Sequence, residues 1–249
     1  MTDALLELDG LMKQFGQLTA VDDVSRSVLA EDLTALIGPN GAGKTTMYNL
    51  MTGVLSPTNG TVRFNGQDMT DTAPADRVRQ GLARSFQVTN IFEGLSVRRN
   101  IRAPVIARSK HRRSLFGSTT EEIESETDRV LDLVGLGDIA SDNCAALSYG
   151  DKRRVEIGLV MATDPDLALL DEPTAGMTPT ETERMVELIE RLNKETEMSF
   201  FITEHDIDFI FDIATRILVL DRGAIIADGP ADEIRQDERV QTAYLGEEA

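Results

Sequence analysis

The segment that most constrains the fold is the run GPNGAGKTT at residues 38–46. It follows LTALI, an apolar run typical of a buried strand, and it leads into TTMYNLMTGV, where apolar residues recur at helical spacing. Gly53 and Pro57 mark the end of that helix. A strand, a glycine-rich turn and a helix in this order predict an α/β domain with a loop at the end of a buried strand.

The order of residues in this loop indicates what it binds. Two glycines enclose four residues and precede a lysine and a threonine, which is the complete phosphate-binding loop pattern. Glycines let the backbone N–H groups turn toward phosphate oxygens, the lysine adds positive charge, and the threonine hydroxyl is a ligand for Mg²⁺. We therefore predict an ATP and Mg²⁺ site formed by Gly38, Pro39, Asn40, Gly41, Ala42, Gly43, Lys44, Thr45 and Thr46.

A second signal is LALLDEP, where an apolar strand ends in Asp171 and Glu172. Two adjacent carboxylates at the end of a buried strand are costly without a cation. We expect Asp171 to support Mg²⁺ and Glu172 to orient and deprotonate the attacking water. The alternative is an acid pair in a solvated turn.

The segment LSYGD lies at a helix start shortly before that acidic strand. Ser148 is a good N-cap, and Gly150 permits close approach, so the turn from Ser148 through Tyr149 and Gly150 to Asp151 is suited to present a hydroxyl and amides to an anion. An ordinary capped helix is the alternative interpretation.

Strands and helices alternate along most of the chain. Residues 1–37 read as short strands, residues 96–147 as mainly helical, and the part from residue 149 as alternating helices and strands. This alternation predicts a parallel sheet covered on both faces.

Composition excludes several classes of protein. A net charge of -18 argues against non-specific nucleic-acid binding, which depends on Lys and Arg. No apolar run is long enough to span a membrane and the N-terminus lacks a signal-peptide pattern, so a cytoplasmic location is expected. The single cysteine, Cys144, is interpreted as a buried filler.

Taken together, these motifs resemble the ATPase subunits of ABC transporters over nearly the whole chain. The resemblance implies a single domain over 1–249, with a P-loop NTPase core of mostly parallel sheet, an N-terminal antiparallel β subdomain and a helical signature subdomain at 88–150. It assigns Phe15 to adenine stacking, Gln87 to Mg²⁺ and water, His205 to the γ-phosphate, and catalysis to Glu172, His205 and Lys44. LSYGD then contacts the ATP of an opposite protomer.

Three segments resemble those of branched-chain amino-acid uptake ATPases: LSYGDKRRVEI, KQFGQLTAVDDV and AYLGEE. Urea or short-amide uptake ATPases are similar. Thr178 departs from the pattern, because many relatives have Asp there. The resemblance implies a homodimer or a heterodimer with a sister ATPase, permease subunits, an extracytoplasmic solute-binding protein reached indirectly, and a peripheral place on the cytoplasmic membrane face. A soluble ABC ATPase outside transport, or a nucleotide-gated assembly module, are the other hypotheses.

One stretch is unusual for so acidic a chain. Between Glu93 and Glu121 there is no acid, yet there are seven cations: Arg98, Arg99, Arg102, Arg108, Lys110, Arg112 and Arg113. This stretch is either a solvated basic loop or a surface that faces the membrane partner or anionic lipid.

The acidic composition leads to one prediction. With 43 acids and only five lysines among 25 basic residues, we hypothesise adaptation to high salt, where screening removes self-repulsion. The melting temperature is expected to rise from low salt to molar KCl in a thermal melt series. A melting temperature that stays flat or falls would contradict the hypothesis.

Overall fold

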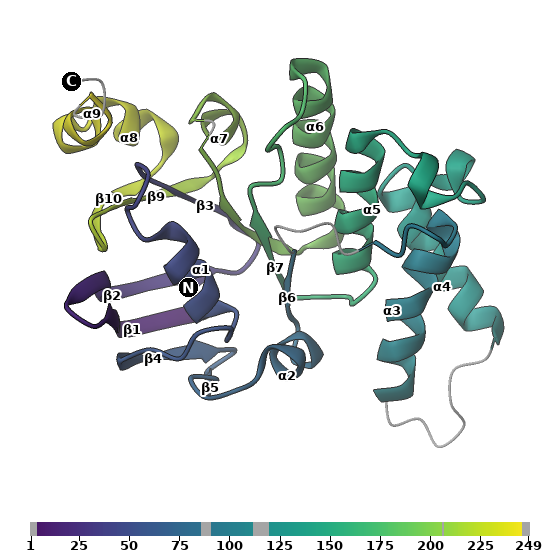
Figure 1. The fold of residues 1–249 in the computed structure, drawn as a ribbon, viewed down its shortest axis with the longest axis horizontal. Coiled ribbons are helices and arrows are strands. Elements are labelled where there is room, and N and C mark those ends of the chain that lie inside the picture. Colours follow the sequence, from purple (N-terminus) through teal and green to yellow (C-terminus); the bar gives the residue numbers. More distant parts are fainter. Residues whose placement is uncertain (1–3, 86–90, 112–119, 206, 246–249) are drawn as a thin grey trace.

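The computed structural model describes residues 4–85, 91–111, 120–205 and 207–245 (Figure 1). Two sheets lie on the left and centre of Figure 1, and a group of helices lies to the right. The first sheet is antiparallel, in the order β2-β1-β4-β5, and the second has the order β10-β9-β3-β8-β7-β6. The strands are β1 (Ala4–Phe15), β2 (Leu18–Leu29), β3 (Leu33–Ile37), β4 (Asn59–Phe64), β5 (Gln67–Asp68), β6 (Leu82–Arg84), β7 (Leu167–Asp171), β8 (Ser199–Thr203), β9 (Arg216–Asp221) and β10 (Ala224–Gly229).

The second sheet is parallel except at one edge. Strands β9, β3, β8, β7 and β6 run parallel, and β10 pairs antiparallel with β9. This arrangement confirms the predicted α/β class with its N-terminal antiparallel part. The strands in residues 1–37 are longer than predicted, because β1 and β2 form one twelve-residue hairpin pair across the turn at Gly16.

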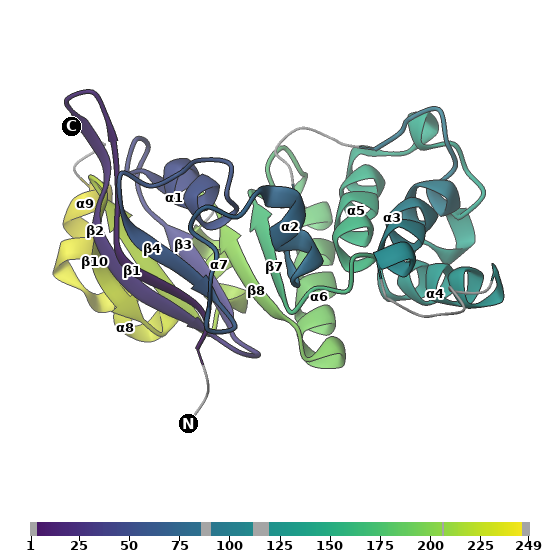
Figure 2. The same cartoon turned by 90° about the horizontal axis from the view of Figure 1, so that it is seen from below.

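Helices cover the sheet and extend to one side of it (Figure 2). Helices α3, α4 and α5 lie together beyond α6, away from α1, in both views. The helices are α1 (Lys44–Met51), α2 (Pro74–Arg79), α3 (Val97–His111), α4 (Thr120–Leu133), α5 (Tyr149–Met161), α6 (Pro179–Thr196), α7 (Ile207–Ile213), α8 (Ala231–Gln236) and α9 (Glu238–Leu245), with short 3-10 turns at Gly137–Ile139 and Cys144–Ala146. None of the helices in the described ranges is both long and apolar enough to cross a membrane.

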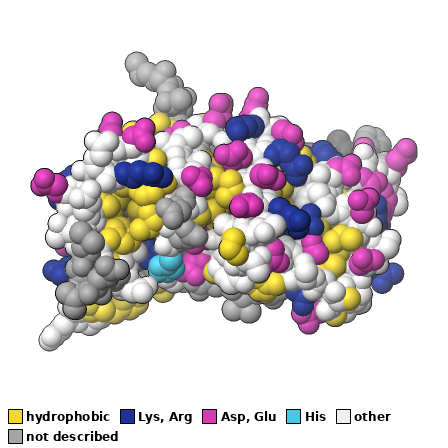
Figure 3. Space-filling model, turned by 90° about the horizontal axis from the view of Figure 1, so that it is seen from above, with side chains coloured by type: hydrophobic (Ala, Val, Ile, Leu, Met, Phe, Trp, Pro, Cys, Tyr) yellow, Lys and Arg dark blue, Asp and Glu magenta, His cyan; other side chains and the backbone are white. Residues whose placement is uncertain are grey.

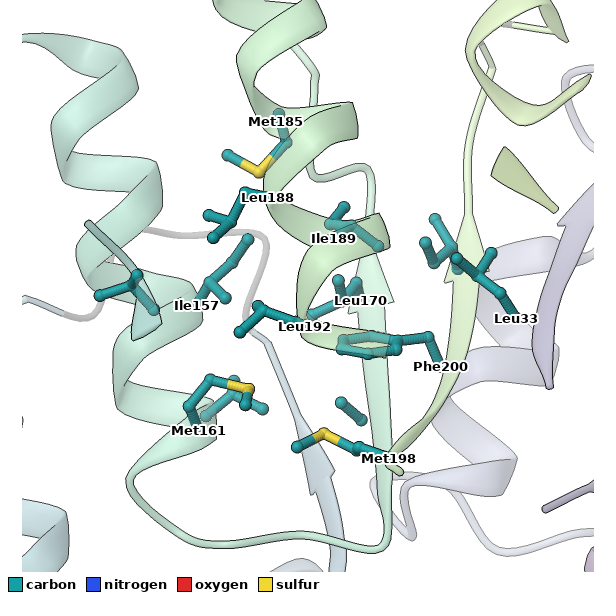
Figure 4. Close-up of a cluster of buried hydrophobic side chains, with 14 of the residues drawn as sticks. Leu33, Ile157, Met161, Leu170, Met185, Leu188, Ile189, Leu192, Met198 and Phe200 are labelled. Atoms are coloured by element: carbon teal, nitrogen blue, oxygen red, sulfur yellow. The ribbon is translucent and has the colours of Figure 1, made fainter. Parts of the chain in front are cut away.

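Both faces of the parallel sheet are buried, as predicted from the alternation of apolar strands and helices in the sequence. On β7, Ala168 and Leu170 join the core beneath α5 and α6, while Leu167 and Leu169 join the core shared with α1 and the antiparallel sheet. Figure 4 shows the first of these cores, where α6 places Leu188, Ile189 and Leu192 near Phe200 and Leu170. The alternation of side chains along each strand therefore supplies two cores at once.

Within the described residues, three of the seven cations in the basic stretch form ion pairs with acidic side chains. Arg98 pairs with Glu124 and Asp128 of α4, and Arg102 pairs with Glu124 at 2.7 Å. Arg108 pairs with Glu126 and with Asp164, each at 2.9 Å. These three arginines therefore join α3 to α4, and Arg108 also joins α3 to the segment after α5. Figure 3 shows basic and acidic side chains mixed across one face. The side chains of Lys110, Arg112 and Arg113 lie outside the described residues.

A buried arginine anchors the far end of helix α1. Arg77, on α2, is 1% exposed. Its guanidinium donates to the carbonyl oxygens of Leu50 and Met51 at 3.0 and 2.6 Å, and to those of Met69, Thr70 and Thr72. Carbonyls at a helix C-terminus have no partner within the helix, so this cation satisfies them. Burial lowers the pKa of Arg77 to about 10, which leaves it charged at neutral pH.

Replacing this arginine is expected to destabilise the fold strongly. Arg77→Met leaves a group of buried carbonyls without donors, and we expect a loss of about 3 kcal/mol or more in the free energy of unfolding. The matched control is Arg79→Met, because Arg79 is exposed and pairs with Asp76 in the same helix; we expect a change within about 0.5 kcal/mol. Urea titration of both variants measures the difference, and equal losses would contradict the anchoring role.

Candidate functional site

The phosphate-binding loop connects β3 to α1 and lies against two neighbouring strands. A Cβ atom on Gly38 would be 2.1 Å from the carbonyl oxygen of Leu220, and a Cβ atom on Gly43 would be 2.2 Å from that of Ala20. Gly43 also has a φ angle of +108°. Glycine is therefore required at these two positions for the loop to fit between β9 and β2.

The loop directs positive potential toward one point. Lys44 is 7% exposed, and its ammonium donates to the carbonyl oxygens of Gly38 and Pro39, at 3.1 Å for Pro39. Helix α1 begins at Lys44 after a glycine N-cap, with no side-chain cap and no acid in its first turn. The Thr45 side chain, next along the helix, is exposed. The N–H groups and the positive end of this helix are thus available to an anion.

Asp171 ends strand β7 in a buried position. It is 6% exposed, it accepts a hydrogen bond from the hydroxyl of Thr203 on β8, and its N–H donates to Ser85 Oγ at 3.0 Å. Burial raises the pKa of Asp171, while the hydrogen bond from Thr203 acts to lower it. Parallel pairing of β7 with β8 places Asp171 opposite Thr203.

Glu172 and His205 meet at the same sheet edge. The Nε2 atom of His205 lies 2.9 Å from the Oε1 atom of Glu172. Glu172 has a φ angle of +48°, and its N–H donates to the carbonyl oxygen of Thr203 at 2.9 Å. This turn of the backbone directs the Glu172 side chain toward the segment that follows β8. The structure therefore brings together two residues that the sequence suggested from separate motifs.

The LSYGD turn forms a capped helix start, as its sequence indicated. Ser148 is the N-cap of α5: its Oγ accepts from the N–H of Asp151 at 3.1 Å and donates to the Asp151 carboxylate at 2.8 Å. A Cβ atom on Gly150 would be 2.9 Å from Oε1 of Glu181, so a larger residue there would displace this carboxylate. Helix α5 lies beyond α6 from α1 in Figures 1 and 2. One chain thus does not bring this turn onto its own phosphate-binding loop.

The remaining predicted positions differ in what the structure shows. Phe15 is 48% exposed at the end of the β1–β2 hairpin, with the ammonium of Lys13 5.3 Å from its ring centroid. Gln87 lies outside the described residues. Cys144 is fully buried and accepts a hydrogen bond from Asn100, which confirms the filler role.

Several supporting residues carried no sequence signal. Tyr48 of α1 donates its hydroxyl to the carbonyl oxygens of Ser85 and Leu169, at 2.7 and 3.1 Å, and so fixes the loop helix to β6 and β7. Glu204 is 3% exposed and accepts hydrogen bonds from the loop after Glu172. Their roles depend on contacts between segments distant in sequence, which no local pattern reports.

The donors near the loop suit Mg²⁺ rather than a transition metal. The described residues hold no cluster of three or more His, Cys, Asp or Glu side chains that could enclose a metal ion. They do offer the exposed Thr45 hydroxyl and the buried carboxylate of Asp171, which accepts a hydrogen bond from the Thr203 hydroxyl. Mg²⁺ is commonly held by one or two protein oxygens together with substrate phosphates and water.

Fold and site together define the ATPases of the ATP-binding cassette class. Residues 21–175 match the family model described as "ABC transporter", and residues 224–249 match the one described as "Branched-chain amino acid ATP-binding cassette transporter". The chain belongs to the ABC transporter family. It binds ATP, and its ATP hydrolysis is coupled to transport.

Within the family the chain is LivG-like. It is 36% identical, over 99% of its length and all of the relative's, to the high-affinity branched-chain amino acid transport ATP-binding protein LivG of Escherichia coli strain K12. It is 30% identical, over 98% of both chains, to the lipopolysaccharide export system ATP-binding protein LptB of Haemophilus influenzae. Among solved structures it resembles the ADP conformation of MJ1267, an ATP-binding cassette of an ABC transporter, with a TM-score of 0.87, 29% identity, and 98% and 100% of the two chains covered.

Two loop glycines provide a matched test of the loop geometry. Gly41 and Gly43 both have positive φ angles, but only a Cβ on Gly43 meets backbone, since the space around Gly41 is open. Both alanine variants incur a backbone cost of about 1 kcal/mol, and Gly43→Ala adds about 1–3 kcal/mol of overpacking. We expect Gly43→Ala to lower the melting temperature more and to lose ATP binding in a fluorescent-nucleotide titration. Equal effects at both positions would contradict the close contact.

Proposed function

We propose that this chain is the ATP-hydrolysing subunit of an importer for branched-chain, hydrophobic amino acids. The observation that carries this proposal is the match of residues 224–249 to the branched-chain amino acid family model. Identity over the whole chain is less discriminating, because the relative LptB belongs to an export system for lipopolysaccharide and is still 30% identical. The matched segment forms β10, α8 and α9, and α9 lines a cavity of about 740 Å³ with the phosphate-binding loop.

The ATP chemistry follows from the groups at the sheet edge. We assign the triphosphate to the N–H groups of residues 38–46 and to Lys44, and the adenine to Phe15. Glu172 takes a proton from the water that attacks the γ-phosphorus, while the bond to the β,γ-bridging oxygen breaks and ADP leaves. His205, 2.9 Å from Glu172, holds that carboxylate and contacts the γ-phosphate. Mg²⁺, held by Thr45, Asp171 and Gln87, would supply charge neutralisation of the phosphates.

The active form in this proposal is a dimer, of two copies or with a sister ATPase. Support comes from the separation of α1 and α5 (Figure 1). ATP bound at the phosphate-binding loop of one chain would lie away from residues 148–151 of that same chain. In a dimer, the turn from one chain completes the site on the other. We also propose that residues 1–249 act as a single ABC ATPase domain, with residues 88–150 as its helical subdomain.

A groove between α2, β6 and α5 suits a permease helix. It has a volume of about 440 Å³, and its walls are mostly apolar side chains, with Arg84 and Glu156 among the polar ones. The apolar members are Pro74, Ala75, Val78, Ala83, Leu159 and Val160. An amphipathic helix can place its apolar face into such a groove. We assign it to a permease subunit on the cytoplasmic membrane face, with a solute-binding protein on the other side and no role for nucleic acid.

The catalytic assignment predicts a separation of binding from turnover. Glu172→Gln keeps a hydrogen-bonding group for His205 but cannot accept the water proton. We expect ATP affinity to stay within about twofold while turnover falls by about 100-fold or more, the range for losing a general base. The control is Glu183→Gln, an exposed acid on α6. Near-normal hydrolysis by Glu172→Gln, measured by phosphate release, would refute the assignment.

The transport assignment is tested by recovering the membrane partners. The tagged chain is purified from its own membranes, reconstituted with the co-purified permeases, and assayed for ATP-driven uptake of leucine, urea and acetamide. Uptake of leucine alone supports the proposal, while uptake of urea or acetamide indicates the amide-importer alternative. Hydrolysis with no membrane partner indicates a soluble ABC ATPase.

The groove assignment has its own test. Leu159→Glu places a charge in the apolar groove and is expected to abolish co-purification of the permeases. Unchanged co-purification would refute the groove assignment.

A further inference from the structure

The loop between β7 and α6 (residues 172–178) is held at its start by a buried carboxylate. Glu204 accepts from the N–H of Thr174 at 2.9 Å and also from the Thr174 hydroxyl. Its second oxygen accepts from the N–H of His205 at 3.0 Å. Because Glu204 is 3% exposed, these bonds are shielded from water. Glu204 thus fixes the loop and the backbone of His205 relative to each other.

The middle of the same loop is held by the LSYGD turn. The Tyr149 hydroxyl donates to the carbonyl oxygen of Ala175 at 2.8 Å. A Cβ atom on Gly176 would lie 3.4–3.6 Å from the Tyr149 ring and hydroxyl, so the phenol lies directly on the loop. Tyrosine occupies this position where most relatives are expected to have glycine, and glycine has no side chain to make this contact.

Tyr149 is itself oriented by a charged pair. Arg153 donates from Nε to the Tyr149 hydroxyl at 3.1 Å, and its guanidinium lies 5.3 Å from the ring centroid. The other side of the guanidinium pairs with Glu156 at 2.9 Å, and both charged side chains are about nine-tenths buried. This pair limits the rotamers of Tyr149, so the hydroxyl is preorganised toward Ala175.

The end of the loop, at Thr178, is held by hydrogen bonds to Glu181 of α6. Thr178, which stands where many relatives have Asp, caps α6: its N–H donates to Glu181 at 2.9 Å, and its hydroxyl donates to the same carboxylate at 2.7 Å. The N–H of Gly150 also hydrogen-bonds Glu181. Thr178 therefore faces its own helix, and the turn at Tyr149 and Gly150 contacts this segment at two points.

We propose that Tyr149 and Glu204 are positioning residues that make the 172–178 loop a rigid connection between the signature turn and the Glu172–His205 pair of the same chain. This inference rests on the proposed function, in which the turn contacts the partner's ATP. A displacement of the turn on closure over that ATP moves Ala175, and Glu204 passes the movement to His205. Each chain thereby adjusts its own hydrolytic pair to the occupancy of the other site.

A double-mutant cycle tests the connection in the purified full-length chain with Mg²⁺ and ATP. Tyr149→Phe removes the bond to Ala175 and keeps the ring. Glu204→Gln has one carbonyl oxygen, so it cannot accept from both Thr174 and His205. Each change is expected to lower kcat about fivefold, with KM for ATP within about twofold, as expected for one hydrogen bond lost in a positioned site. The double variant should be no slower than the slower single variant.

The controls distinguish a failure of this inference from a failure of the proposed function. Tyr244→Phe removes a phenol hydroxyl on α9 and is expected to leave kcat unchanged, and melting temperatures show whether any variant is misfolded. Additive losses, an unchanged kcat in Tyr149→Phe, or a raised KM with normal kcat would each overturn the connection while the wild-type chain still hydrolyses ATP. A wild-type chain without hydrolysis would overturn the proposed function and the connection together.

Discussion

The parallel register of β3, β8 and β7 is the constraint on which the site depends. All three strands end at one edge of the sheet, so the phosphate-binding loop, Thr203 and Asp171 arrive there together. Each strand is buried on both faces, which prevents a shift of register without exposing one of two cores. The same burial that stabilises the sheet therefore fixes the distances between groups that act on the phosphates.

The position of Glu172 depends on a local turn of the backbone directly after β7. The strand delivers Asp171 into a buried environment, and a positive φ angle at the next residue turns the chain so that Glu172 reaches His205. Non-glycine residues in this backbone region are uncommon and need support from their surroundings. The hydrogen bond from the Glu172 N–H to Thr203 provides such support, and it comes from the neighbouring strand.

Sequence patterns predicted the parts of this protein that are governed by local chemistry. The strand, loop and helix around Lys44, the acidic end of β7 and the Ser148 cap each depend on a few consecutive residues, and each was found where expected. Contacts between distant segments were not predicted: Arg77 beneath α1 and the bond from Tyr149 to Ala175 leave no periodic trace. The ion pairs of Arg98 and Arg108 were not predicted for the same reason, since their acidic partners lie on α4 and beyond it.

The buried Arg77 links three pieces of chain that are not adjacent: the end of α1, the 69–72 turn and α2. Because a single guanidinium bonds to carbonyls of all three pieces, opening any one of them leaves part of a buried charge without its hydrogen-bond partners. We therefore expect the end of α1 and helix α2 to open to water together, as one cooperative unit. The phosphate-binding helix is thus fixed at its C-terminal end by a residue that does not contact the nucleotide loop.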